Sequence, residues 1–207
     1  MKEFVEFRKI PRLNREIIVT EKIDGTNAQV SIRHASEDDF EVGIDTYVEV
    51  NDIQAYMRAG SRNRWLNQSS SGDNFGFAKW VSSHSEMLAN LGFGDHYGEW
   101  WGVGIQRGYG LTEKRFSLFN TSRWSLDTVP YCCHVVPVLY QGPWVDWGAS
   151  EYGDFAPDNA LTTLRYGGSL AAPGFMKPEG IIVYHTAGNL YFKATCENDD
   201  TPKSIAK

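Results

Sequence analysis

The chain has 207 residues, of which 42% are hydrophobic and 14% aromatic, and its formal net charge is −6. This composition predicts a folded domain with a sizeable core, and the seven Trp residues exclude a disordered chain. The negative charge argues against tight, non-specific binding of nucleic acid. A local basic patch is still compatible with a few phosphate contacts. Arg8, Lys9, Arg12 and Arg15 form one candidate, for which a solvated face is the simpler interpretation.

Cysteine usage and hydropathy bear on where the protein works. Cys132, Cys133 and Cys196 show no paired spacing, and adjacent cysteines rarely bridge each other because the geometry is strained. We therefore interpret all three as reduced thiols. No stretch approaches the ~18 apolar residues of a membrane span, and the first residues lack the apolar centre of a signal peptide. These features predict a cytoplasmic protein without a membrane partner.

Segments typical of β-strands dominate the chain, because runs of β-branched and aromatic residues recur between turn signals. In chain order they cover residues 17–19, 28–32, part of 37–47, 97–103, 116–119, 132–139, 180–184 and 190–194. The last two flank the turn-like sequence HTAGN and predict a hairpin.

Helical and loop signals are fewer. Residues 77–91 carry apolar side chains at helical spacing, and Gly92 should end this helix. Residues 160–164 predict a short helix, and the small polar residues 67–74 predict a loop. Because the connections are too short for regular βαβ crossovers, we expect an α+β domain of antiparallel sheets with flanking helices. We expect a single domain over residues 1–207, with a frayed tail after about residue 196.

The segment TEKIDGTN at residues 20–27 carries the strongest chemical signal. It places Lys22 between two predicted strands, shortly before Asp24 and Gly25. A lysine becomes a nucleophile only after losing its proton, which requires desolvation or neighbouring positive charge such as a metal ion. A Lys-x-Asp-Gly match alone has low specificity, so the case for Lys22 depends on motifs later in the chain.

Five further motifs lie beyond this lysine. They are GSRN at residues 60–63, YGEWWG at 97–102, FSLF at 116–119, KPEGIIV at 177–183 and LYFK at 190–193. With residues 20–27 they resemble, in order and composition, the covalent nucleotidyltransferase superfamily of RNA ligases, DNA ligases and mRNA capping enzymes. The likeness is closest to the RNA ligase branch, whose first motif often reads Glu-Lys-Ile-x-Gly-x-Asn, as residues 21–27 do. It spans residues 20–193 and implies a nucleotidyltransferase domain of the ligase type.

The resemblance implies catalytic roles for two lysines. Lys22 would attack the α-phosphorus of ATP, expel pyrophosphate and hold AMP as a phosphoramidate. Lys193 would neutralise charge on the α-phosphate during transfer. Glu179 would help to hold a divalent metal ion, Mg²⁺ or Mn²⁺, because a hard cation prefers carboxylate oxygen and phosphate.

The resemblance also implies which residues bind the nucleotide. Glu99 would accept hydrogen bonds from the ribose, and Phe119 would stack on the adenine, with Phe116 as the alternative ring. Arg62 would contact a phosphate or the incoming 5′-phosphate end, which suits a forked guanidinium. Asn27 would support the phosphate or metal geometry near the lysine. The full set implied to contact the nucleotide is Glu21, Asn27, Arg62, Glu99, Phe119 and Glu179.

Each of these residues has a simpler interpretation when taken singly: a paired acid, a core aromatic ring, a turn or a solvated arginine. Only their co-occurrence with Lys22 favours the functional one. The glycines between residues 102 and 110 lack the spacing of a phosphate loop, so we expect a flexible connection there. The aromatic segment at residues 140–152 is interpreted as a loop packed over the core rather than a surface that stacks bases.

Two features depart from the family's pattern. Ligases of this group commonly carry two lysines one residue apart in the last motif, whereas Tyr191 and Thr195 occupy the alternate positions beside Lys193. One lysine then suffices, or its partner comes from elsewhere, with Lys177 and Lys203 as candidates. Many relatives also have a C-terminal domain, and we expect a minimal catalytic domain here, with either modest intrinsic affinity or a helper protein in place of that domain.

These observations predict an ATP-dependent RNA ligase that joins 3′-hydroxyl and 5′-phosphate ends. The enzyme would be adenylated on lysine, AMP would pass to the 5′-phosphate, and the 3′-hydroxyl would attack with release of AMP. Two alternatives stay open: a DNA nick ligase of the same chemistry, and a module that binds a nucleotide or RNA end without catalysis. RNA repair and a phage or virus source would suit so compact a ligase.

Overall fold

The structure, a computed structural model, describes residues 3–35, 40–69, 71–146, 154–197 and 199. Contacts within the chain group it into two compact units. The first comprises Met1–Lys22 and Pro137–Lys207, and the second comprises Ile23–Val136. The chain therefore passes from one unit to the other after Lys22 and returns at Pro137. That the whole chain forms one domain stays a prediction.

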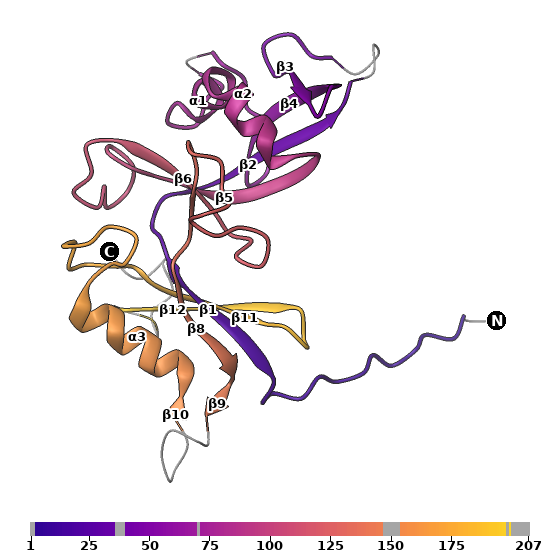
Figure 1. The fold of residues 1–207 in the computed structure, drawn as a ribbon. Helices are drawn as coiled ribbons and strands as arrows, with labels where there is room; N and C mark the ends of the chain where they lie inside the picture. Colours follow the sequence, from indigo (N-terminus) through magenta and orange to yellow (C-terminus); the bar gives the residue numbers. More distant parts are fainter. Residues whose placement is uncertain (1–2, 36–39, 70, 147–153, 198, 200–207) are drawn as a thin grey trace. The chain divides into compact units, whose positions relative to one another are not determined.

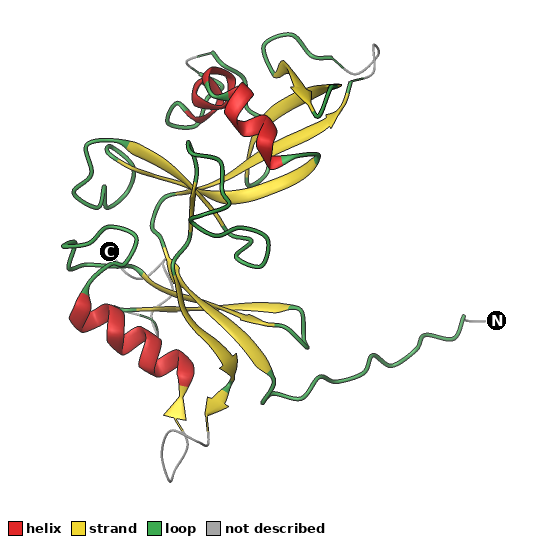
Figure 2. Cartoon of the chain, viewed as in Figure 1, coloured by secondary structure: helices red, strands yellow, loops and turns green. Residues whose placement is uncertain are grey.

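The first unit is built on a four-stranded antiparallel sheet in the order β12-β11-β1-β8 (Figure 1). Its strands are β1 (Glu16–Lys22), β8 (Val138–Pro143), β11 (Gly180–His185) and β12 (Leu190–Thr195). A small ladder of β9 (Val145–Asp146) and β10 (Asp154–Phe155) leads into helix α3 (Ala156–Gly167). Figure 2 shows α3 lying along this sheet.

Alternation along β1 explains how this sheet buries one face. Ile17 and Val19 are fully buried, and together with Ile181 and Val183 of β11 they pack against Ala160, Leu161 and Leu164 of α3. Side chains two residues apart in a strand point to the same face. The helix therefore covers the face that carries the odd-numbered residues of β1, and the even-numbered residues lie on the opposite face.

The second unit contains a six-stranded sheet in the order β3-β4-β2-β5-β6-β7, in which only the β6–β7 pair is parallel. Its strands are β2 (Thr26–His34), β3 (Asp45–Val50), β4 (Ile53–Ser61), β5 (Gly94–Gly102), β6 (Lys114–Leu118) and β7 (His134–Val135). The short helices α1 (Phe77–Ser83), α2 (Ser85–Leu88) and η1 (Ala89–Leu91) supply apolar side chains to its core.

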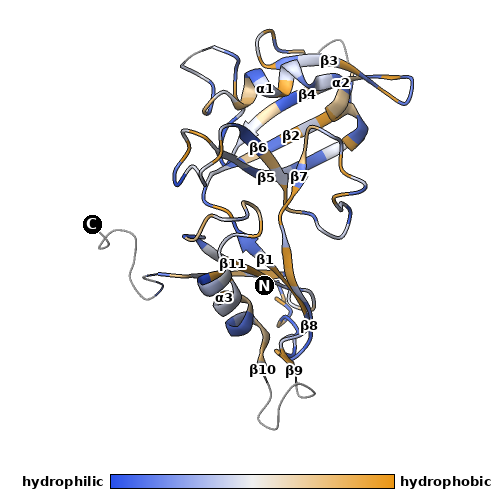
Figure 3. Ribbon diagram, turned by 60° about the vertical axis from the view of Figure 1, so that its left-hand side comes forward, coloured by the Kyte–Doolittle hydropathy of each residue, from blue (hydrophilic) through white to orange (hydrophobic). Residues whose placement is uncertain are grey.

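Hydrophobic and hydrophilic residues alternate along β2 and β4, as the colours in Figure 3 show. The buried residues Ala28, Val30 and Ile32 of β2 pair with positions of β4 that are also largely buried. These side chains join Phe77, Leu88 and their helical neighbours in one apolar cluster. The other face of the sheet carries the alternate, mostly polar residues of β2.

The predicted α+β class with antiparallel sheets is confirmed, and so is the hairpin of β11 and β12. The strand expected within residues 37–47 lies later, at Asp45–Val50, and the short helix expected at 160–164 extends over Ala156–Gly167. Strand β4 was not predicted. Most of the segment after residue 196, where a frayed tail was expected, lies outside the described residues, as do residues 147–152 of the aromatic segment.

A single helix over residues 77–91 is wrong, because the helix breaks at His84. The carbonyl of Trp80 is bonded by the Ser83 hydroxyl at 3.0 Å and by His84 Nδ1 at 2.9 Å. The Trp80 carbonyl still accepts the helical bond from His84 N at 3.0 Å, and the helix is interrupted because the backbone of His84 leaves helical geometry, with φ −114° and ψ 14°. The proposed strand at 132–139 is likewise divided, since Pro137 cannot donate to a ladder and separates β7 from β8.

Two further observations concern the chain as a whole. None of Cys132, Cys133 and Cys196 forms a disulfide bond. In the part of the chain that the structure describes, no helix has both the length and the apolar character needed to cross a membrane.

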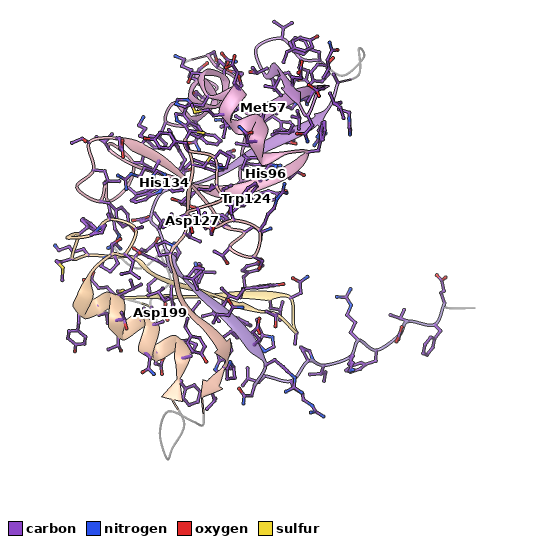
Figure 4. All side chains as sticks on the ribbon, viewed as in Figure 1. Met57, His96, Trp124, Asp127, His134 and Asp199 are labelled. Carbon is purple, nitrogen blue, oxygen red and sulfur yellow. The ribbon has the colours of Figure 1, made fainter. Side chains whose placement is uncertain are left out.

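His96 lies on the core side of β5, where its protonation is opposed by burial. It is buried, donates from Nε2 to the Gly92 carbonyl at 2.9 Å, and lies beside Trp124 with ring centroids 6.4 Å apart (Figure 4). Burial lowers the pKa of His96, the bond to Gly92 partly offsets this, and Arg123 adds to the lowering. The folded state thus binds a proton less readily than the unfolded state.

We therefore predict that stability falls as the pH drops below the ordinary histidine range of about 6.5. Each unit by which the folded pKa is lowered corresponds to about 1.4 kcal/mol that is lost once the pH passes below the folded pKa. Urea unfolding between pH 7.5 and 5 should show a smaller pH dependence for His96→Gln than for the wild type. The control is His34→Gln, at an exposed histidine, which should keep the wild-type dependence. Equal slopes for His96→Gln and the wild type would contradict the prediction.

Candidate active site

Lys22 is the last residue of β1 and lies on the face of the four-stranded sheet opposite α3. The buried Val19 and Glu21 lie on the helix side of the strand, so the alternation of side chains directs Lys22 away from the helix. The Lys22 side chain is 21% exposed, and its Nζ forms an ion pair with Oε2 of Glu179, whose side chain is 5% exposed. The structure therefore brings together two residues that are separated by 157 positions, the difference between 179 and 22.

The position of Glu179 depends on the close packing of the residue after it. Gly180 pairs with Lys22 on one side and with Thr195 on the other. A Cβ at Gly180 would lie 2.1 Å from the Ala194 carbonyl oxygen, so only glycine fits there. The carbonyl of Glu179 also accepts a bond from Cys196 N at 2.9 Å. The backbone of Glu179 is thereby held between β1 and β12.

Lys193 lies on the same face as Lys22. It pairs with Ile182, which pairs with Thr20, two residues before Lys22. Directly paired residues share a face, and so do residues two apart in one strand. The alternate positions of β12, where a second lysine was sought, hold Tyr191 and Thr195. Of the other candidates, Lys177 is exposed and Lys203 lies outside the described residues.

Glu21 points to the other face and has different partners from those that the resemblance implies. It is 1% exposed. Its Oε1 accepts from the Ser169 hydroxyl at 2.5 Å, and its Oε2 accepts from the backbone N–H groups of Leu170 at 2.8 Å and Ala171 at 2.9 Å. Burial raises the pKa of Glu21, and these hydrogen bonds act in the opposite direction. A contact between Glu21 and a nucleotide stays a prediction.

In the second unit, Asn27 and Glu99 face each other across β2 and β5. Ser117 of β6 is the next residue in the same row and accepts a bond from Trp101 Nε1 at 2.9 Å. Glu99 Oε1 accepts from the backbone N–H of Gly25 at 3.1 Å. The row lies on the sheet face opposite the apolar cluster, because its residues alternate with members of that cluster. Two of the predicted site residues are thus cross-strand neighbours.

The two phenylalanines of FSLF differ in surroundings. Phe116 is fully buried, with its ring centroid 5.2 Å from that of Phe77, and belongs to the core. Phe119 lies just after β6, donates its N–H to the Tyr97 carbonyl at 2.9 Å, and is 40% exposed. The interpretation as a core aromatic ring therefore holds for Phe116. The ring of Phe119 is exposed enough for a base to reach it.

Arg62 comes directly after Ser61, the last residue of β4, and is exposed. Two arginines near it have structural partners. Arg58 forms an ion pair and a second hydrogen bond with the buried Asp45, and Arg64 donates to the Gly72 carbonyl at 2.9 Å. The exposure of Arg62 at the end of the strand is compatible with a contact to a phosphate.

Sequence reasoning missed a set of contacts around the turn at Asp24. The backbone N–H of Asp24 donates to the Tyr109 hydroxyl at 2.8 Å, and Arg107 Nε donates to Asp24 Oδ2 at 2.9 Å. Both partners come from the glycine-rich segment that we expected to be a flexible connection. Tyr109 is 2% exposed and has a positive φ of 53°. No local pattern predicts bonds between segments that lie 85 residues apart in the sequence.

These observations can be compared with known proteins. The family model described as RNA ligase matches residues 15–203. The chain belongs to the RNA ligase family. Comparison with curated proteins gives no match.

Solved structures of Naegleria gruberi RNA ligase share the fold of this RNA ligase family chain. A mutant with ATP and Mn is 19% identical with a TM-score of 0.53, and an apo mutant is 20% identical with a TM-score of 0.54. In both cases the match covers 88% of this chain and 50% of the Naegleria chain. The chain thus corresponds to about half the length of these structures, and at such identities the likeness shows the fold alone.

A candidate metal ligand lies beside Lys22. Among the described residues, no group of three or more His, Cys, Asp or Glu side chains is arranged to hold a metal ion. Mg²⁺ is commonly bound by one or two carboxylates together with substrate phosphates and water. The buried carboxylate of Glu179 beside Lys22 fits that mode of binding, in which the nucleotide supplies further oxygen ligands.

The contrast between the two phenylalanines leads to a stability prediction. Phe116→Ala should destabilise the protein by about 3–5 kcal/mol, because it leaves a cavity in the core. Phe119→Ala should change stability by less than about 0.5 kcal/mol, because the ring is partly exposed. Urea unfolding monitored by tryptophan fluorescence measures both. A cost for Phe119→Ala as large as that for Phe116→Ala would contradict these assignments.

Proposed function

We propose that the chain is an ATP-dependent RNA ligase that joins 3′-hydroxyl and 5′-phosphate ends through a lysyl-AMP intermediate at Lys22. The observation that carries the proposal is the ion pair of Lys22 with the buried Glu179 at the end of β1. Membership of the RNA ligase family supports RNA as the substrate. The Naegleria ligase structures with ATP and Mn, and with AMP and Mn, support a nucleotide and a divalent metal.

The ion pair explains how Lys22 can be held ready for attack. In this ion pair Nζ donates to the carboxylate of Glu179, so the lysine cannot attack until that contact is relieved. Glu179 would hold a divalent metal ion, Mg²⁺ or Mn²⁺, which would offset phosphate charge when bound. Nζ would release its proton to water and form a bond to the α-phosphorus as the bond to pyrophosphate breaks.

Lys193 would act on the charge that develops during this step. It lies on the same sheet face as Lys22, two strands away. A fixed cation there would stabilise the negative charge on the α-phosphate oxygens in the transition state. The two later steps, transfer of AMP to the 5′-phosphate and attack by the 3′-hydroxyl, also develop charge on phosphate oxygens and would use the same residue.

Residues of the second unit would bind the remaining parts of the substrates. Glu99 would accept hydrogen bonds from the ribose, beside Asn27, which would support the phosphate geometry. Phe119 would stack on the adenine, as its exposure permits. Arg62 would contact the 5′-phosphate end, where a guanidinium can make two parallel hydrogen bonds. In the first unit, Glu21 was assigned to the nucleotide as well, but its present partners favour another role.

Two alternatives are less well supported. A DNA nick ligase would use the same chemistry, but the matching family model is that of RNA ligases. A binding module without catalysis would have no need for a lysine paired with a buried glutamate. The chain covers about half of the Naegleria structures. A helper protein that grips the polynucleotide stays a proposal.

The first test is incubation with α-labelled ATP and Mg²⁺, and then denaturing electrophoresis. We expect label on the wild type and none on Lys22→Ala, because the nucleophile is lost. The control Lys79→Ala removes an exposed lysine of α1 and should be labelled like the wild type. The protein should first be treated with pyrophosphate to remove AMP already attached. A wild type that stays unlabelled with ATP, GTP and NAD would overturn the proposal.

A second test identifies the lysine that acts on the phosphate. Lys193→Ala should slow adenylation by about 100-fold, the usual effect of losing one group that stabilises transition-state charge. Lys177→Ala should change the rate by less than about threefold, because a solvent-screened surface charge contributes little. Single-turnover labelling measures both rates. A larger loss of rate in Lys177→Ala than in Lys193→Ala would assign the charge-stabilising role to Lys177.

A further inference from the structure

The segment that connects α3 to Glu179 is a loop with little apolar anchorage. It runs over residues 168–178, and Figure 2 shows it between α3 and β11. Leu170 is 50% exposed and Met176 is 56% exposed, whereas Ala172 and Pro178 are buried and Phe175 is half-buried. Apolar burial therefore holds the loop at few positions, although the loop leads directly to the residue that pairs with Lys22.

Hydrogen bonds close this loop on itself. Ser169 N donates to the Phe175 carbonyl at 2.8 Å, and Phe175 N donates to the Ala172 carbonyl at 3.0 Å. Ser169 Oγ accepts from Ala172 N at 3.0 Å. At the start of the loop, Gly168 has a φ of 80°, and a Cβ there would lie 2.8 Å from the Phe175 carbonyl oxygen. The loop is thus a compact turn whose shape depends on polar contacts.

Glu21 joins this compact turn to the sheet. Both of its carboxylate oxygens are occupied by the loop, through Ser169, Leu170 and Ala171. A buried carboxylate is costly unless hydrogen bonds satisfy it, and three donors do so here. Glu21 and Lys22 are neighbours on β1 that point to opposite faces, so one strand end contacts both the start of the loop and Glu179 at its far end.

We propose that Glu21 is a positioning residue: its carboxylate fixes the 168–178 loop and so sets Glu179 against Lys22. This inference rests on the proposed function for its catalytic consequence. The contacts themselves distinguish it from a direct nucleotide contact, because a side chain that is 1% exposed, with both oxygens bonded to the loop, is not accessible to a ligand.

Three variants test the role of Glu21. Glu21→Ala removes all three bonds. Glu21→Gln keeps one oxygen for the N–H groups of Leu170 and Ala171, and its amide can donate to Ser169 Oγ. Ser169→Ala removes the hydroxyl contact alone. The matched control is Glu16→Gln, at an exposed glutamate at the start of the same strand. Glu21→Gln and Ser169→Ala keep the test valid if Glu21→Ala does not fold.

The first readout needs no ATP. Amide hydrogen exchange over residues 168–176 should speed up at least about tenfold in Glu21→Ala, less in Ser169→Ala, and little in Glu21→Gln or Glu16→Gln. Protection unchanged in Glu21→Ala and in Ser169→Ala would overturn the proposal, because Glu21 would then not hold the loop. This result stands even if the wild type proves unable to label itself with ATP.

The second readout separates positioning from direct binding. In Glu21→Ala, adenylation at fixed Mg²⁺ should slow by about 100-fold, and the Mg²⁺ concentration for half-maximal rate should rise, because Glu179 is misplaced. The KM for ATP at saturating Mg²⁺ should change little, and Glu21→Gln should restore most of the rate. A raised KM for ATP with unchanged loop protection would instead indicate direct nucleotide contact and overturn the proposal. If the wild type self-labels and Lys22→Ala does not, such a result would leave the proposed function intact.

Discussion

The ion pair of Lys22 and Glu179 depends on a single register. Lys22 pairs with Gly180 across β1 and β11, and this pairing places Glu179 beside the end of β1. A slip of one residue would reverse the faces of every side chain on the strand. Lys22 would then point toward α3, where Leu161 and Leu164 form an apolar surface. The packing of α3 on the other face of the sheet therefore fixes the direction of the Lys22 side chain.

The same strand end carries two charges in opposite environments. Lys22 is partly exposed and pairs with a buried carboxylate, whereas Glu21 is buried on the helix side and is satisfied by three donors of one loop. Neither arrangement gains much from charge alone, since desolvation offsets the attraction of buried ions. Both arrangements restrict the positions that their side chains can occupy. The ionic groups here serve mainly to place atoms, which is what a group-transfer site needs.

In the second unit, the pairing of strands in the sheet places the polar candidate residues. Asn27, Glu99 and Ser117 form a row across three strands, on the face opposite the apolar cluster. Gly25 lies close to this row: a Cβ there would be 2.5 Å from the Trp100 carbonyl oxygen. The turn after Lys22 is thus packed directly on β5, and Tyr109 and Arg107 bind Asp24 within it. The sheet thereby orients these polar side chains.

The sequence alone determined the antiparallel α+β class, the hairpin of β11 and β12, and the set of motifs that led to the RNA ligase family. These are local features, because strand periodicity and short motifs are written in neighbouring residues. The strand β4 was missed, since its pairing with β2 depends on contacts that no local pattern contains. The break at His84 was missed because the apolar spacing continues through it to Leu91.

Only the tertiary structure decided the surroundings of each candidate residue. It separated the buried Phe116 from the exposed Phe119, paired Lys22 with Glu179, and directed Glu21 to the loop after α3. Burial and pairing are set by which face a strand presents and by what packs on it. For Lys22 and Glu21 those depend on residues more than a hundred positions away, so the sequence could name the chemical groups but not their partners.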